Sequence, residues 1–144
     1  MTVASILKGK RTVVHWVSPT LSVGVVAERL RSADVGVMIV SSDGESLLGV
    51  ISERDIAHGL AVHGAALPSL KVSDLMARSV ITCTPEDDVA EIARIMTMRR
   101  IRHIPVMDEG RIAGVVSIGD VLKSRISEIE IEANVLRDLA VAHR

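Results

Sequence analysis

The chain of 144 residues repeats its own pattern, and this repetition limits its possible folds more than any other feature. GVISERDI stands at 49–56 and GVVSIGDV at 114–121, and both read Gly, Val, apolar, Ser, two variable residues, Asp, apolar. When Pro19 is aligned with Pro85, the similarity extends along most of the chain. Because equal patterns of apolar and polar residues favour equal elements, the sequence predicts two similar folding units.

Each half follows the order strand, helix, strand, strand, helix. Apolar residues at helical spacing predict amphipathic helices near 23–30 and 89–96. Gly follows an acidic residue in SSDGES and in MDEGR, which is typical of tight hairpin turns. Entry strands are predicted in TVVHWV (12–17) and SVITCT (79–84), buried strands at 35–40 and 101–106, and return strands at 47–51 and 112–116.

We therefore expect an α/β (α+β) fold of two pseudo-symmetric repeats, 1–63 and 64–126, packed sheet to sheet, with a C-terminal helical extension at 127–144. The lead-in TVASIL at 2–7 is similar to KVSDLM at 71–76, so the repetition includes the residues ahead of each entry strand. A repeat of about 60 residues would bury its sheet poorly by itself, which favours one module made of both.

Composition excludes several classes of protein. The net charge is −1 and the only aromatic residue is Trp16, so neither a broad nucleic-acid surface nor base stacking on several rings is expected. No apolar run approaches the roughly 20 residues of a membrane span, and the first residues lack an apolar core of signal-peptide length. With a single cysteine, Cys83, the chain suits a reducing compartment. We expect a soluble, cytoplasmic protein.

The two octapeptides, with HIPV at 103–106, resemble the cystathionine-β-synthase (CBS) domain. The pair resembles a tandem CBS or Bateman module of the small stand-alone bacterial type, over about residues 2–126. This resemblance implies a regulatory module that is not an enzyme and that binds an adenosine-containing ligand in clefts between its two repeats. AMP is the first candidate, and ADP, ATP, NAD(H) and S-adenosylmethionine are others. The alternative is a ligand-free scaffold for protein interaction and oligomerisation.

The resemblance also assigns roles to the motif residues. Asp55 and Asp120 would hold ribose hydroxyls, and Ser52 and Ser117 would contact phosphate. The chemistry is compatible, because a carboxylate can accept from both hydroxyls of a diol and a helix start offers hydroxyl and N–H donors to a phosphate. The same pattern is typical of a helix N-terminal cap, so both interpretations stay open.

The two predicted sites differ in sequence. Arg54 directly precedes Asp55, whereas the second motif lacks that cation and has Arg102 and His103 upstream. Pro105 cannot donate to a sheet ladder, so it marks an edge, a bulge or a strand end. The resemblance implies that further residues line the sites: Val17, Ser18, Thr20, Val37 and Met38, and also Thr82, Cys83, Thr84, Asp87, Ile104 and Pro105.

Catalytic and metal motifs were not found in the sequence. It has no phosphate loop and no dinucleotide fingerprint. His58 and His63 have no cysteine or acidic cluster beside them, so a metal site is not expected. Asp55 and Asp120 belong to different repeats, so they do not form a catalytic carboxylate pair. We expect neither catalytic residues nor bound metal.

The C-terminal residues predict a long helix with two apolar stripes. One stripe has heptad spacing, and the other lies on the opposite face. We expect one stripe to pack on the repeats and the other to bind a partner, giving a homodimer formed by module faces and this helix, with an unidentified protein target. The first stripe is Leu122, Ile126, Ile129, Ala133, Leu136 and Ala140, and the second is Ile131, Val135 and Leu139.

Overall fold

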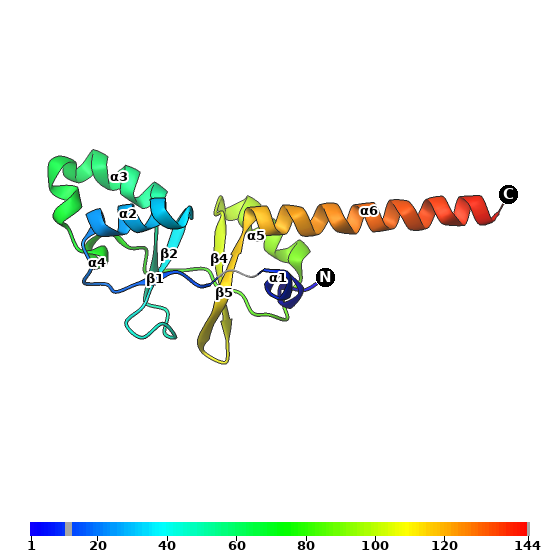
Figure 1. The fold of residues 1–144 in the computed structure, drawn as a ribbon, viewed down its shortest axis with the longest axis horizontal. Coiled ribbons are helices and arrows are strands. Elements are labelled where there is room, and N and C mark those ends of the chain that lie inside the picture. The colour runs from blue at the N-terminus through cyan, green and yellow to red at the C-terminus, as the bar shows by residue number, and fades with distance from the viewer. Residues whose placement is uncertain (11–12, 144) are drawn as a thin grey trace. The chain divides into compact units, whose positions relative to one another are not determined.

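The computed structural model describes residues 1–10 and 13–143 (Figure 1). It forms two compact units. One unit draws on residues 1–11, 83–104 and 116–144, and the other on residues 12–82 and 105–115. Both contain helices and strands, as the sequence predicted. The start of the predicted strand TVVHWV, at Thr12, lies outside the described residues.

The unit built from residues 12–82 and 105–115 contains a three-stranded sheet in the order β1-β2-β3. β1 pairs with β2 in parallel, and β2 pairs with β3 in antiparallel orientation. Its core includes Val17, Val26, Met38 and Ile51. The elements are β1 (Trp16–Val17), α2 (Val23–Ala33), β2 (Val37–Val40), β3 (Gly49–Ser52), α3 (Glu53–His63), the 3₁₀ helix η1 (Gly64–Ser69) and α4 (Val72–Leu75).

The other unit contains helices and the two ends of a hairpin whose middle, residues 105–115, belongs to the unit of residues 12–82. The hairpin turns at Glu109 and Gly110, which both have positive φ (50° and 77°), the backbone conformation of a type I′ turn. The tight turn predicted from MDEGR is therefore confirmed. The elements are α1 (Val3–Gly9), α5 (Val89–Arg99), β4 (His103–Asp108), β5 (Arg111–Ser117) and α6 (Ile118–Ala142).

The turn predicted from SSDGES is wrong. Eight residues, 41–48, separate β2 from β3, and the Asp43 carboxylate organises them. Its Oδ1 accepts from the backbone N–H groups of Glu45 (2.8 Å) and Ser46 (2.7 Å) and from the Ser41 hydroxyl (3.1 Å). A short polar side chain that bonds to nearby backbone can stabilise a wider loop without a two-residue turn.

Helices α2 and α5 start and stop in the same way. Ser22 and Asp88 are their N-caps, and each side chain accepts a backbone N–H. Asp34 and Arg100 are their C-caps, and both adopt the left-handed conformation with φ of 54°. The predicted pair of equivalent helices is confirmed, and both extend beyond the predicted apolar spacing, to Ala33 and Arg99.

The entry strands are shorter than predicted. β1 has only two residues, and its second-repeat counterpart is reduced to an isolated bridge residue at Cys83. Pro105 lies within β4, an edge strand of the two-stranded sheet, where a missing N–H is tolerated.

The two lead-ins are helices, and each docks on the helix start of the other repeat. Val72 donates its backbone N–H to Leu21 (2.8 Å), and Leu70 accepts from Val23 (2.8 Å). The equivalent bonds of the other unit run from Val3 to Asp87 (2.9 Å) and from Val89 to Met1 (3.1 Å). The compact units therefore do not coincide with 1–63 and 64–126, because the lead-ins are exchanged and residues 105–115 join the unit of residues 12–82.

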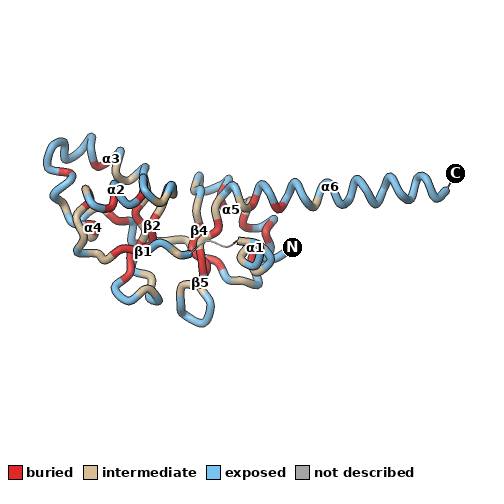
Figure 2. Tube along the Cα trace, in the orientation of Figure 1, coloured by how far each residue is buried: buried red, intermediate tan, exposed pale blue. Residues whose placement is uncertain are grey.

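Burial follows the strands and the inner faces of the helices, while most of α6 is exposed (Figure 2). Val121 and Ser124 of α6 are buried, but both predicted apolar stripes are exposed. The expectation that one stripe packs on the repeats is therefore wrong. Over residues 1–10 and 13–143, no helix has the combination of length and apolar character that a membrane crossing requires.

Candidate functional site

Both Ser-x-x-Asp motifs form capping boxes at the first turn of a helix. In α3, the Ser52 hydroxyl accepts from the Asp55 N–H (3.2 Å), and Asp55 Oδ2 accepts from the Ser52 N–H (2.9 Å). In α6, Ser117 accepts from the Asp120 N–H (3.1 Å), and Asp120 Oδ2 accepts from the Ser117 N–H (2.9 Å). The acid at the third helical position also lies at the positive end of the helix dipole. The structural role of both motifs is confirmed.

Each helix start is tied to the strand that precedes it in its repeat. Glu53 donates its N–H to the carbonyl of Gly36 (3.0 Å), and Ile118 donates its N–H to the carbonyl of Arg102 (2.8 Å). In the first repeat, Val37 lies opposite Ser52 across the β2–β3 pair. The folding of each repeat thus places one polar motif beside the start of a buried strand.

The first motif keeps part of its polar surface available. Ser52 and Asp55 are half-buried, and Arg54 is exposed. The Ser52 hydroxyl also donates to Asp55 Oδ2 (2.9 Å), so the cap occupies that oxygen. Among the described residues, nothing donates a hydrogen bond to Asp55 Oδ1. A carboxylate oxygen with open lone pairs can accept from a ligand hydroxyl.

The second motif has a cation that the sequence did not reveal. Lys10 Nζ donates to Asp120 Oδ2 at 2.7 Å, and both side chains are about one quarter exposed. Burial by itself raises the pKa of the Asp120 carboxyl. The hydrogen bond from Lys10, the Ser117 N–H and the Lys10 charge outweigh it, so this pKa lies below its ordinary value. The residues at the start of α6 suggested that the second site lacks a positive charge, but Lys10 supplies one.

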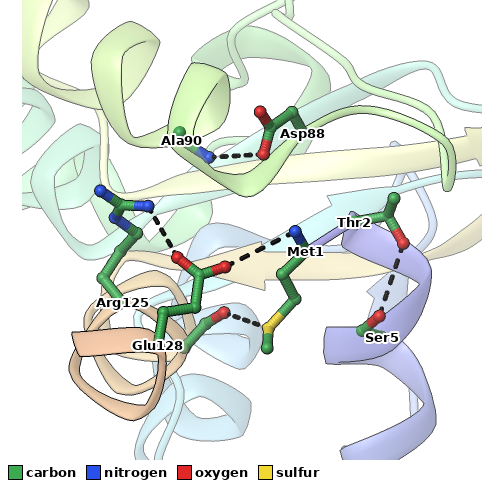
Figure 3. A network of polar contacts seen from close by, with 8 residues as sticks. Met1, Thr2, Ser5, Asp88, Ala90, Arg125 and Glu128 are labelled. Carbon is green, nitrogen blue, oxygen red and sulfur yellow. Dashed lines mark hydrogen bonds and ion pairs between the residues drawn. The ribbon is translucent and has the colours of Figure 1, made fainter. Parts of the chain in front are cut away.

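A cavity of about 290 Å³ lies between α1 and α6 beside this ion pair. Hydroxyl, ammonium and carboxylate groups face it, together with a somewhat larger apolar surface. Nearby, Ser124 donates to Met1 Sδ (2.7 Å), and Glu128 accepts from Arg125 (2.7 Å) and faces the Met1 nitrogen at 3.5 Å (Figure 3). The lining residues are Met1, Ser5, Ile6, Gly9, Lys10, Asp120, Lys123, Ser124 and Ser127.

The other predicted site residues are distributed more widely. In the three-stranded sheet, Val17 lies opposite Val40, at the end of β2 away from the Val37–Ser52 pair. Ser18 and Thr20 follow Val17 and hydrogen-bond to each other (2.9 Å). Within this unit, the structure does not bring these three residues beside Asp55. Met38 is buried in β2, and Thr82 is exposed.

Most of the residues predicted for the second site lie in the unit that holds Asp120, while Thr82 and Pro105 belong to the other unit. Thr84 donates its N–H to the Asp87 carboxylate (2.8 Å), which is therefore engaged in a local turn. Burial and the nearby Asp87 charge raise the pKa of the Cys83 thiol to about 11. Ile104 is buried, His103 is half-buried and Arg102 is exposed. Cys83 therefore contributes to packing and is not an activated nucleophile.

No group of three or more histidine, cysteine, aspartate or glutamate side chains in the described part of the chain is arranged to hold a metal ion. The polar groups of the two motifs are carboxylate oxygens, hydroxyls and cationic side chains, which can hydrogen-bond to hydroxyl and phosphate groups.

Comparison with known proteins agrees with this fold. The family model for the CBS domain matches residues 3–62 and 72–127. The chain belongs to the CBS-domain family, and it carries two copies of the domain. Members of this family that contain such pairs are generally regulatory proteins.

Individual relatives support the same assignment. The CBS domain-containing protein CBSX3, mitochondrial, of Arabidopsis thaliana is 37% identical over 127 residues, which are 84% of this chain and 62% of that protein. The chain thus spans less than two thirds of the length of that relative. The crystal structure of the CBS-domain containing protein ATU1752 from Agrobacterium tumefaciens has a TM-score of 0.83 and 36% identity, covering 87% of this chain and 99% of that one.

A second solved structure is of a complex with a ligand. CBSX2 in complex with AMP has a TM-score of 0.73 and 26% identity, and the match covers 88% of this chain and 96% of that one. The ligand is a property of that protein.

Proposed function

We propose that the chain is a regulatory module, without catalytic activity of its own, that binds an adenosine-containing ligand at its Ser-x-x-Asp helix starts. The observation that supports this most is the Asp55 carboxylate. The cap uses Oδ2, and the other oxygen accepts no hydrogen bond from the described residues. Together the two oxygens can accept from both hydroxyls of a ribose, as a vicinal diol requires.

The charged neighbours suit the phosphate of a nucleotide. Arg54 is exposed one residue before Asp55, and Lys10 lies against Asp120. A guanidinium can bind a phosphate with two hydrogen bonds, and an ammonium can bind it as a point charge. Since each motif combines a diol acceptor with a nearby cation, a ribose phosphate fits both better than a neutral nucleoside does.

AMP is the first candidate, because a member of the same family is known in complex with it. ADP, ATP, NAD(H) and S-adenosylmethionine present the same adenosine and are the other candidates. The ligand would regulate a protein target by binding two states of the module with different affinity. We further propose that the module acts as a homodimer in the cytoplasm.

The test is a calorimetric titration of the full chain with AMP, ADP, ATP, NAD, NADH and S-adenosylmethionine. At least one should bind, and Asp55→Asn or Asp120→Asn should weaken that binding about tenfold or more, because an amide is a poorer acceptor for a diol than a carboxylate. Asp88→Asn is the matched control. Asp88 caps α5 outside the motifs, and asparagine caps a helix about as well as aspartate, so this change should leave both affinity and stability nearly unaltered.

One observation favours the alternative function. Both capping boxes are complete within the chain, so Asp55 and Asp120 have a structural role that needs no ligand. If none of the six compounds binds, the motifs serve the fold alone, and a constitutive interaction scaffold is the better interpretation.

A further inference from the structure

Helix α6 carries an exposed apolar seam that has no partner among the described residues. Leu122, Ile126, Ile129 and Leu136 keep 56%, 55%, 60% and 67% of their surface exposed. Such a row on a soluble protein is typical of an interaction surface. We call these four, with Ala133 and Ala140, the α6 seam; their spacing alternates between four and three residues.

The α6 seam points away from the unit to which α6 belongs. Val121 and Ser124 are 2% and 7% exposed, and Glu128 is half-buried, so these positions face the unit. In a heptad that places Leu122 at d, Val121 and Glu128 are at c and Ser124 is at f, nearly opposite a and d. A second helix can therefore cover the seam without displacing the buried residues by which α6 packs on its unit. Arg125, which pairs with Glu128 on its own helix (2.7 Å), lies at the rim of the seam.

The charges beside the seam match a parallel partner. In a parallel, in-register pair, each g residue faces the e residue five positions later on the other helix. Arg125 would face the partner's Glu130, and Glu132 would face the partner's Arg137. By two-fold symmetry each pair occurs twice, so four contacts of opposite charge flank the seam.

An antiparallel pair of α6 helices over the same residues would instead place like charges beside the seam. It would bring Glu130 against the partner's Glu130, and Glu132 against the partner's Glu132. Lys123 would face the partner's Arg137. These contacts all join like charges, so the flanking residues discriminate against this orientation as well as favouring the other.

We propose that α6 pairs with α6 of a second copy of this chain as a parallel, in-register two-stranded coiled coil along the α6 seam. Leucine and isoleucine fill the d layers, while Ala133 and Ala140 leave room at two a layers for the helices to approach closely. The two compact units that contain α6 then lie on the outer sides of the pair. This inference specifies one contact of the homodimer and does not depend on whether the motifs bind a nucleotide.

Cysteine cross-linking of the full chain tests the orientation. In a Cys83→Ala background, Ala133→Cys places a thiol at an a layer, where two copies face each other only if the helices are parallel and in register. Asn134→Cys, one residue along on an exposed face, is the control. Under mild oxidation, Ala133→Cys should form the interchain disulfide about tenfold faster or more, since its partner lies within bonding reach.

Two results would overturn the parallel pair. One is equal cross-linking at positions 133 and 134. The other is preferential cross-linking between Ala133→Cys and Ile129→Cys in a mixture, because an antiparallel pair places position 133 opposite the partner's Ile129.

Charge reversal gives an independent measurement by sedimentation equilibrium. One variant carries Glu130→Lys with Glu132→Lys, and the other carries Arg125→Glu with Arg137→Glu. Each alone should weaken dimerisation about tenfold or more, because every flanking contact then joins like charges, and mixing the two should restore it. Dimerisation that neither variant changes would show that α6 does not form the interface.

Discussion

Asp43 holds the loop between β2 and β3 through one carboxylate. Hydrogen bonds from the backbone N–H groups of Ser46 and Glu45, followed by the Ser46 and Ser41 hydroxyls, lower the pKa of this carboxyl from 3.8 to about 2. All of these donors favour the charged form. The folded pKa is depressed, so the stabilisation is complete above the unfolded pKa and is lost as the pH falls through about 2.

We predict that the Asp43 carboxyl carbon titrates in an NMR experiment with a midpoint near 2. In Asp43→Asn, the backbone amides of Glu45 and Ser46 should exchange with solvent faster at neutral pH, because a neutral acceptor binds them less strongly. Exchange in β2 should stay unchanged. A midpoint close to 4, the ordinary value for aspartate, would contradict the loop geometry.

Cys83 should be inert in the native protein. Its side chain is 4% exposed, and burial together with Asp87 raises the pKa of the thiol to about 11, so almost no thiolate forms near pH 8. A disulfide reagent should modify Cys83 quickly only after unfolding in denaturant. Because the unfolded thiol ionises at lower pH than the folded one, stability should fall as the pH rises from about 9 to about 11. Rapid native labelling would show that the site is open.

At the scale of elements, the left-handed C-cap of α5 offers a direct test of how the helix ends. Arg100 has φ of 54°, a conformation that costs a non-glycine residue about 1–2 kcal/mol. Arg100→Gly should therefore raise the free energy of unfolding by about 0.5–1 kcal/mol in a urea titration, after allowing for the more flexible unfolded chain.

Arg99→Gly is the matched control for this prediction. Arg99 is the last residue of α5, where glycine should lower stability by roughly 1 kcal/mol, because helical backbone favours other residues. Equal effects of the two substitutions would mean that α5 does not end at Arg100.

At the scale of the whole molecule, the exchange of the lead-ins predicts which segments unfold together. Val3 is fully buried in α1, and Val3→Ala should lower the free energy of unfolding by about 2 kcal/mol through the cavity it leaves. Hydrogen exchange should then accelerate at the Val89 amide, which donates to Met1, more than at the Val23 amide, which donates to Leu70.

The control for this prediction is Val13→Ala, because Val13 is 79% exposed and its truncation should change stability by less than about 0.5 kcal/mol. If Val3→Ala accelerated exchange at Val23 as much as at Val89, the lead-ins would not act on separate units.

Much of this fold could be predicted from the sequence, because it rests on local patterns. The apolar spacing at 23–30 and 89–96 predicted α2 and α5, and Ser-x-x-Asp predicted the starts of α3 and α6. In these cases the residues that set the element lie within one or two turns of it.

Other features could not be predicted, because they depend on residues far apart in the chain. Lys10 and Asp120 are 110 residues apart in the chain, and Lys10 belongs to no sequence motif that would indicate their contact. The lead-ins were recognised as similar to each other, but TVASIL and KVSDLM are too short to show helical periodicity. The docking of α1 on α5 and of α4 on α2 depends on backbone hydrogen bonds. Every residue except proline can donate such a bond, so the order of side chains does not predict them.

The docking of α1 also affects the order in which the chain can fold during synthesis. Residues 1–10 are synthesised well before Pro85 and Asp87, whose carbonyls accept from Ala4 and Val3. Until then α1 has no surface to cover, and a segment this short is not stable as an isolated helix. Contacts of such long sequence separation form slowly. Residues 1–10 are therefore expected to be among the last to become protected from proteases.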